Sequence, residues 1–308
     1  MAEALRSKAT SGSLTGARLG ILAGATLFST GGAAIKACHF SGLELAGLRS
    51  GVAVVAVLCL LPSARRGWTA RSLLVGLAYA LTMILFVLAN KLTTAASTIF
   101  LQATAPLYIL LLGPWLLAEP IRRLDLVFLG ALAAGLALFF VGMDLPAPTA
   151  PDPLLGNVLA AASGATYALT IIGLRWMGKW GSAGGSAAPA VLAGNLIVFL
   201  ATCPWLGWPG GGRGDWLVVI YLGVFQIALG YAFLTSALRR LPALEASLLM
   251  MVEPVLNPLW AFILQGERPG PWTLAGGGLI LLATALKTWW DAGARRAAPP
   301  RTATLETQ

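Results

Sequence analysis

The amino-acid sequence predicts an all-α membrane protein with ten transmembrane helices, arranged as two inverted five-helix repeats. Three observations predict this fold: an apolar composition, ten apolar segments of membrane-spanning length, and an internal repeat whose copies face opposite ways. Of the 308 residues, 57% are hydrophobic and only 11% are charged, whereas soluble proteins carry about a quarter charged residues. We therefore expect the chain in a bilayer, where backbone groups must be hydrogen-bonded within helices or a closed barrel.

The apolar segments are too long and too continuous for barrel strands, which alternate over about ten residues. A helix needs roughly 20 apolar residues to cross the hydrocarbon. Spans are predicted at 16–37, 43–61, 69–90, 95–117, 123–142, 154–176, 187–206, 215–238, 243–265 and 272–290. The first is too long for a signal-peptide core, so we expect it to be retained behind a polar tail at 1–15. A second tail at 291–308 has the composition of a disordered end.

The internal repeat has an offset of 148 positions. Pro106 and Glu119 in the first half correspond to Pro254 and Glu267 in the second. We expect one repeat at 16–142 and another at 154–290, joined by a loop at 143–153. Because five helices is an odd number, the second repeat enters the membrane from the opposite side. Inverted repeats around a site at the midplane indicate a secondary transporter, although some channels share them.

Positive charges predict the orientation, because cytoplasmic loops are enriched in Lys and Arg. On the side of the N-terminus the sequence places Arg6, Lys8, Arg18, Arg65, Arg66, Arg71, Arg122, Arg123, Arg175, Lys179, Arg239, Arg240, Lys287, Arg295, Arg296 and Arg301. The other side has Lys36, Lys91, Arg213 and Arg268, and Arg49 lies near a membrane boundary. Both termini should therefore be cytoplasmic.

Several functions are not supported by any motif. The sequence has no Gly-rich loop followed by Lys-Ser or Lys-Thr, no His-Glu-x-x-His pair and no Gly-x-Ser-x-Gly elbow. The spacing of its three cysteines indicates neither a disulfide framework nor a metal site, and there is a single histidine. The net charge of +9 lies in loops rather than in a nucleic-acid-binding surface. We expect no enzyme activity, no cofactor, no metal and no nucleic-acid partner.

Two pairs of residues follow the repeat. Pro106 and Pro254 lie inside equivalent spans, where proline removes a helix hydrogen bond and produces a kink. They are either hinges of an alternating pathway or static kinks. Glu119 and Glu267 end these spans beside Arg122 and Arg268, and a salt bridge or loop cap is the favoured role because a carboxylate opposes the dipole of a helix C-terminus.

Two charged residues lie inside the predicted spans. Glu253 precedes Pro254, and a charge at that depth usually faces a partner or a water-filled cavity. It is a candidate for binding a substrate amine or a proton; the alternative is a Glu bonded to backbone freed by the proline. Arg49 is a candidate for a substrate carboxylate. Its favoured role is structural, since an Arg near a helix end reaches the interface easily.

The predicted pathway is an apolar wall with a few polar groups, the usual form of a small-molecule site. The alternative for each polar residue is a hydrogen bond between helices without any substrate. The candidates, from the first, third, fourth, sixth and eighth spans, are Thr26, Ser29, Tyr79, Met83, Gln102, Tyr167, Gln226 and Tyr231.

Taken together, these motifs resemble those of the drug/metabolite transporter superfamily, and within it the EamA-type ten-helix exporters. The resemblance covers about residues 16–290. It is carried by Lys36, by Arg49, by the stretch Thr94-Ala95-Ala96 … Pro106 … Glu119 … Leu129-Gly130 and by its echo Ala243 … Pro254 … Glu267 … Gly277-Gly278. Phe28-Ser29 departs from the pattern, since the family often has Trp-Gly there.

The whole chain is most similar to the YddG-type branch, and this resemblance implies export of aromatic and other amino acids through a pathway between the two halves. We therefore expect a secondary exporter of small metabolites in the bacterial cytoplasmic membrane, with a small-molecule substrate and the lipid bilayer as partners. The alternatives are a carrier for drugs, nucleobases or other metabolites, a channel, or a membrane-embedded enzyme. The oligomeric state is left open.

Overall fold

A computed structural model describes residues 2–116, 121, 123–141, 145–180, 187–207, 210–238, 240–241 and 243–297, without the side chains of 2–13, 178–180, 238, 243–244, 247, 292 and 294–297. Over these residues the protein is almost entirely helical, as the sequence predicts. Nine helices of the described part are long and apolar enough to cross a membrane.

The first half consists of α1 (Ala2–Ser29), α2 (Gly31–Ala37), α3 (Gly42–Leu60), the short η1 (Pro62–Arg65), α4 (Ala70–Leu92), α5 (Ala95–Gln102), α6 (Ala105–Leu116) and α7 (Arg123–Val141). The second half consists of α8 (Pro153–Trp180), α9 (Ala188–Thr202), η2 (Cys203–Trp205), α10 (Arg213–Ile220), η3 (Tyr221–Leu229), α11 (Gly230–Leu238), α12 (Ala243–Met250), α13 (Val252–Gln265) and α14 (Pro271–Ala297). Several predicted spans are thus built from two consecutive helices.

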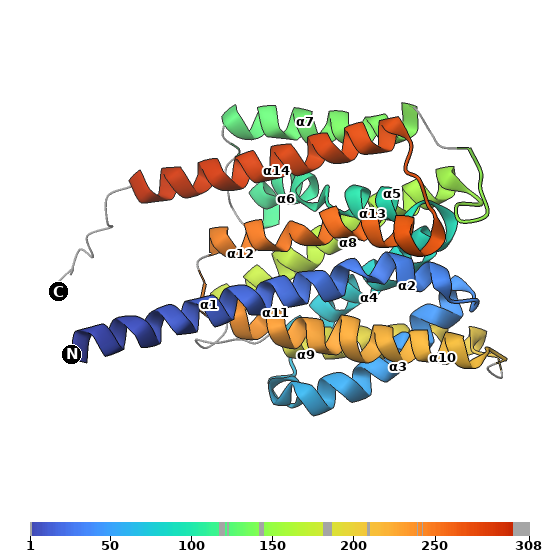
Figure 1. Ribbon diagram of the computed structural model, residues 1–308, viewed down its shortest axis with the longest axis horizontal. Helices are drawn as coiled ribbons and strands as arrows, with labels where there is room; N and C mark the ends of the chain where they lie inside the picture. The colour runs from blue at the N-terminus through green and yellow to red at the C-terminus, as the bar shows by residue number, and fades with distance from the viewer. Residues whose placement is uncertain are drawn as a thin grey trace.

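The tenth predicted span lies within α14, which is not among the nine. The apolar stretch of α14 contains Gly276, Gly277, Gly278 and Lys287. It runs along α7 in the direction opposite to it (Figure 1). Lys287 forms an ion pair with Asp125 of α7 at 2.8 Å, and this partner makes its position in the bundle tolerable.

The chain reverses direction from one span to the next. Figure 1 shows α1 and α7 starting at the end of the molecule where the first and last described residues lie, here called the terminal end. In the same view α8 and α14 start at the opposite end, here called the far end. The first and last helices of one half therefore run opposite to those of the other.

Contacts between the halves follow a two-fold pattern. In one half α4, the third span, packs against α8 and α9; in the other, α11 and η3, also the third span, pack against α1 and α3. The fourth spans meet through α5 and α13, and the fifth through α7 and α14. This exchange of partners is what two inverted copies of one unit would produce, and it places the seam between the halves at the centre of the bundle.

Glycine allows a close crossing between α4 and α9. A Cβ on Gly76 would lie 2.8 Å from the Cβ of Ala193, and a Cβ on Gly194 would collide with the ring of Tyr79. Small residues permit such close approach of helices in membranes. The crossing holds Tyr79 against α9.

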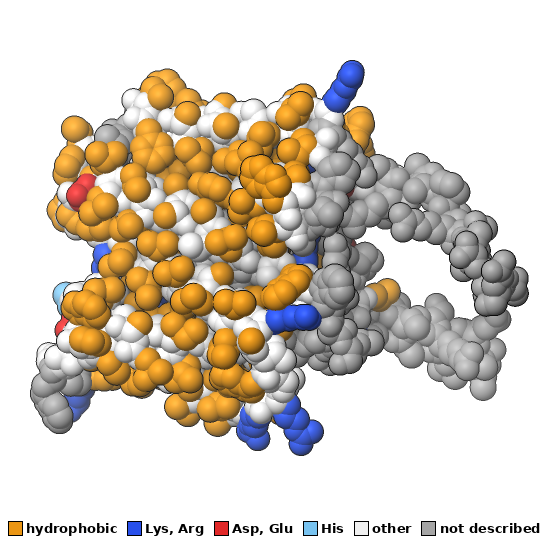
Figure 2. All heavy atoms as spheres, turned by 180° about the vertical axis from the view of Figure 1, so that it is seen from behind, with side chains coloured by type: hydrophobic (Ala, Val, Ile, Leu, Met, Phe, Trp, Pro, Cys, Tyr) orange, Lys and Arg blue, Asp and Glu red, His pale blue; other side chains and the backbone are white. Residues whose placement is uncertain are grey.

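Apolar side chains cover the flanks of the molecule. Leu19, Val55, Val127, Ile263 and Leu264 are each more than 60% exposed. Figure 2 shows hydrophobic side chains over the face opposite to that of Figure 1, with the Lys and Arg side chains mainly towards its ends and margins. An apolar surface of this extent suits lipid rather than water.

Candidate functional site

The fourth span of each half is broken near its middle. A turn at 103–104 separates α5 from α6, and Met251 separates α12 from α13. Pro106 and Pro254 are near the start of the second piece, where proline fits because the first N–H groups of a helix have no internal partner. Broken helices at corresponding positions of two inverted halves are the usual frame of a binding site at the midplane.

Three aromatic rings meet at the seam between the halves and are called here the aromatic cluster: Phe28 of α1, Tyr79 of α4 and Tyr231 of α11. The ring of Tyr231 is 5.2 Å from that of Phe28 and 6.0 Å from that of Tyr79, both edge to face. Phe28 and Tyr231 are partly exposed, whereas Tyr79 is buried. The cluster joins both repeats into one apolar wall.

Glu253 lies in the first turn of α13, at the break in the fourth span of the second half. Its carboxylate interacts electrostatically with Tyr167 of α8 and Tyr231. Among the residues that the structure describes, no hydrogen bond or ion pair reaches this carboxylate, which favours its role as a binding group over a bond to freed backbone. The side chain is partly exposed, as is Tyr167, which is 37% exposed despite its central position.

Arg49 lies in α3 behind Met83 and is only 1% exposed. Its Nη2 donates to the Met83 carbonyl at 3.4 Å and approaches the Met83 sulfur at 3.6 Å. The expectation that Arg49 extends to the membrane interface is therefore wrong, because its side chain points into the bundle. Asn195 of α9 donates from Nδ2 to the Tyr79 hydroxyl at 3.4 Å.

Of the remaining predicted pathway residues, Gln226, Gln102 and Thr26 form one group and Ser29 stands apart. Gln226 is in the π-helical segment η3 beside Gly31, and its Oε1 is buried without a partner among the described residues. Gln102 ends α5 and donates to Ser163 of α8 at 2.7 Å, across the two halves. Thr26 is partly buried on α1. These three remain near the seam.

Ser29 is a correction. It is fully buried, donates to the Thr26 carbonyl at 2.7 Å and accepts the indole N–H of Trp260 at 2.9 Å. With both of these hydrogen bonds formed inside the bundle, Ser29 connects α1 to α13 and does not line a pathway. In this structure Ser29 forms a hydrogen bond between helices, which was the alternative to lining the pathway.

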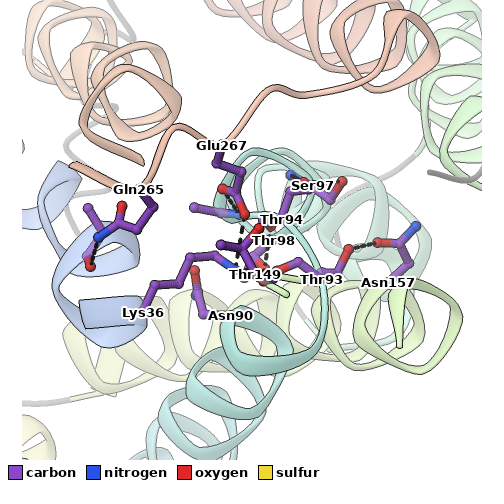
Figure 3. A network of polar contacts seen from close by, with 12 residues as sticks. Lys36, Asn90, Thr93, Thr94, Ser97, Thr98, Thr149, Asn157, Gln265 and Glu267 are labelled. Carbon is purple, nitrogen blue, oxygen red and sulfur yellow. Dashed lines mark hydrogen bonds and ion pairs between the residues drawn. The ribbon is translucent and has the colours of Figure 1, made fainter. Parts of the chain in front are cut away.

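A buried ion pair connects the two halves at the far end. Lys36 Nζ lies 3.1 Å from Glu267 Oε1, and both side chains are almost completely buried. Lys36 also donates to the carbonyls of Thr93 and Thr149, while Glu267 accepts the backbone N–H of Ala95 at 2.8 Å. Figure 3 shows Lys36 and Glu267 extending toward each other from different elements. We call this pair and its bonds the far-end network.

The far-end network fits the local helix dipoles. Lys36 is in the last turn of α2, where a cation is favoured, and the Glu267 carboxylate lies at the N-terminus of α5, where an anion is favoured. Beside it, Thr93 donates to Asn157 of α8 at 2.8 Å (Figure 3). A pocket of about 370 Å³ opens next to Glu267, lined also by Thr94 and Arg268.

The pairing of Lys36 with Glu267 is not predicted by the sequence. We expected Glu267 beside Arg268, its neighbour in the chain, whereas the structure brings Glu267 to a lysine 231 positions earlier. The predicted topology places Lys36 and Glu267 on the same side of the membrane, and this is the one feature of the sequence that could have indicated their pairing. Glu119 and Arg122 lie outside the described residues. In the described part, no group of three His, Cys, Asp or Glu residues is arranged to hold a metal.

The fold and the site together define a class: helical membrane transporters with broken helices around a central site. Residues 15–141 and 154–289 each match the model of the EamA-like transporter family, and the chain belongs to that family.

Two similar proteins are named as exporters. The threonine/homoserine exporter RhtA of Escherichia coli K12 and that of Escherichia coli O157:H7 are each 32% identical to this chain over 179 residues. The match covers 56% of this chain and 58% of each relative, so it spans little more than half of either protein.

A solved crystal structure of another protein shares the fold. It has a TM-score of 0.59 and 19% sequence identity, and the match covers 92% of this chain and 99% of that one. At this identity the similarity concerns the fold alone.

Proposed function

We propose that this protein is a secondary transporter that exports amino acids or related small metabolites across the cytoplasmic membrane by alternating access. The observation that carries the proposal is the carboxylate of Glu253, which has no ion-pair partner among the described residues and lies at a broken helix beside Tyr167 and Tyr231. A partly exposed anion among aromatic rings suits a cargo with an ammonium group and an apolar side chain. The similarity to RhtA, named for threonine and homoserine export, agrees with this cargo.

Alternating access would use the seam between the halves. In this proposal the repeats at 16–142 and 154–290 exchange conformations, Pro106 and Pro254 allow the fourth spans to bend, and the far-end network closes one side. Lys36 and Glu267 come from different halves, so breaking their ion pair would allow the halves to separate there. Residues 1–15 and 291–308 would be cytoplasmic tails, which makes the far end the external side.

The decisive experiment is counterflow in proteoliposomes containing the purified full-length chain. Vesicles loaded with unlabelled threonine, homoserine, phenylalanine or methionine should take up the corresponding label in a saturable way. Empty vesicles are the control. Saturable counterflow distinguishes a carrier from a channel or an enzyme, and the absence of flux for the whole amino-acid panel would refute the proposed cargo.

The aromatic cluster favours a second cargo class. Phe28, Tyr79 and Tyr231 present ring edges and faces that also suit flat aromatic molecules. A carrier for drugs, nucleobases or other metabolites would then use the same seam. Nucleobases and cationic dyes belong in the same counterflow panel, and flux of these compounds without flux of amino acids would support the second class.

A further inference from the structure

Arg49 is a buried cation whose charge has no carboxylate partner among the described residues. It lies seven residues into α3, about 10 Å from the start of the helix, and is 1% exposed. Within the described part of the chain, no Asp or Glu forms an ion pair with it, and Tyr79 is the ionisable group with which it interacts electrostatically. An unpaired buried charge is strongly unfavourable, so its position in the bundle calls for an anionic partner.

The side edge of the Arg49 guanidinium is only partly hydrogen-bonded. Nη2 has a long bond of 3.4 Å to the Met83 carbonyl and a contact of 3.6 Å to the Met83 sulfur. Nε is buried with no partner among the described residues. Nε and Nη2 form the side edge of the guanidinium, whose two parallel N–H groups match the two oxygens of a carboxylate.

Met83 separates this edge from the seam. The side chain of Met83 is partly exposed and packs against the apolar cluster that contains Tyr79 and that Tyr231 also contacts. Methionine is unbranched and flexible, so it can rotate at low cost. Rotation of this side chain would remove the sulfur from Nη2 and open Arg49 toward the aromatic cluster.

We infer that Arg49 is the carboxylate-binding residue of the transport site: its Nε and Nη2 bind the carboxylate of the cargo when Met83 moves aside. The inference rests on the proposed function and narrows its cargo to molecules with a free carboxylate. A cargo with a free carboxylate is thereby selected over an amine that lacks one. Arg is suited to this role because its planar fork binds carboxylates in a bidentate manner, which Lys does not.

The test uses pairs of ligands that differ only in the carboxylate. Threonine and threoninol, or phenylalanine and phenylalaninol, compete for counterflow of a labelled amino acid in the wild type, Arg49→Met and Arg49→Lys. In the wild type the amino acid should compete at least about tenfold better than the alcohol, the effect of one charge-assisted bidentate pair. Arg49→Met should reduce this ratio to about one, and Arg49→Lys should retain only part of it.

Arg66→Met is the matched control, because Arg66 is exposed and distant from the seam; its ratio should equal that of the wild type. Met83→Leu should alter the affinity for the amino acid more than that for the alcohol.

An unchanged ratio in Arg49→Met, or an equal loss for both ligands, would show that Arg49 is structural and overturn the inference. Dependence of transport on chloride with no discrimination between the ligand pairs would also overturn it, because the anion would then be inorganic. Lack of counterflow in the wild type would refute the proposed function itself, and this result differs from every result that refutes only the role of Arg49.

Discussion

Glu253 and Arg49 both lie in membrane-spanning helices, yet their surroundings differ. Glu253 is partly exposed beside two tyrosines, whereas Arg49 is closed off by Met83. Ser29, also predicted to line the pathway, is buried and forms two hydrogen bonds inside the bundle. At the scale of the residue, function is therefore expected where polar atoms lack an internal partner, and packing where they have one.

Glu253→Gln should raise the KM for amino acids by about tenfold or more, because it removes the charge from a hydrogen bond or ion pair with the cargo ammonium. Counterflow with labelled threonine measures this. Glu44→Gln is the matched control: Glu44 belongs to the capping box of α3, where Gln also serves. An identical KM for Glu253→Gln and the wild type would assign Glu253 to packing.

At the scale of the element, the two broken spans and the far-end network are the parts expected to move. The breaks before Pro106 and Pro254 interrupt the backbone hydrogen bonds of the fourth spans, and the Lys36–Glu267 pair joins one half to the other. Other contacts between the helices are expected to stay in place, because they carry no charge and are closely packed. They are the hydrogen bond between Thr93 and Asn157 and the crossing of α4 and α9 at Gly76 and Gly194.

Pro254→Ala should lower the maximal transport rate by about tenfold with little change in KM. Alanine supplies an N–H in the first turn of α13 that can bond back across the break at Met251, so a continuous span would resist bending. Pro258→Ala, one turn further along the same helix, is the control. Equal effects of both substitutions on the rate would indicate static kinks instead of a hinge.

Lys36→Met should open the far end. Removing one partner of a buried ion pair costs about 3–5 kcal/mol, and here the cost falls on the closed conformation. Cys38 reports the change, because it is 3% exposed and burial raises the pKa of its thiol, so it reacts slowly when the far end is closed.

The measurement is maleimide labelling of Cys38 in a Cys59→Ser, Cys203→Ser background. Lys36→Met should label at least about tenfold faster than its parent. Lys287→Met removes a lysine that is paired with Asp125 at the terminal end, and it should leave the rate unchanged. Slow labelling of Cys38 in both variants would mean that the far-end network does not hold this end closed.

At the scale of the whole molecule, the halves are intertwined: each third span packs against the first two spans of the other half. Neither half has a separate core that faces only itself. A change of conformation must therefore rearrange the contacts between the halves, and a site on their seam is exposed to that rearrangement.

The inverted arrangement predicts that equivalent positions of the two repeats face opposite compartments. In a background lacking the native cysteines, Arg123→Cys should react with an impermeant maleimide only from the cytoplasmic side, and Arg268→Cys only from outside. Both positions are exposed, so access does not limit the labelling. Labelling of both from one compartment would show co-oriented repeats and contradict the alternating-access mechanism.

The sequence by itself determined the fold class, the approximate spans and the family. Apolar length and the 148-residue repeat of Pro106 and Glu119 as Pro254 and Glu267 are local or periodic signals, which survive without knowledge of contacts. The breaks in the fourth spans were also predictable, because proline acts through its own backbone.

The tertiary structure alone decided which polar groups meet. That Lys36 binds Glu267, that Ser29 is bonded to Trp260 and that Arg49 lies behind Met83 depend on packing between spans 34 to 231 positions apart. A helical pattern fixes the depth of a side chain but leaves its facing partner undetermined, because the partner is chosen by how the spans of the two halves pack against each other.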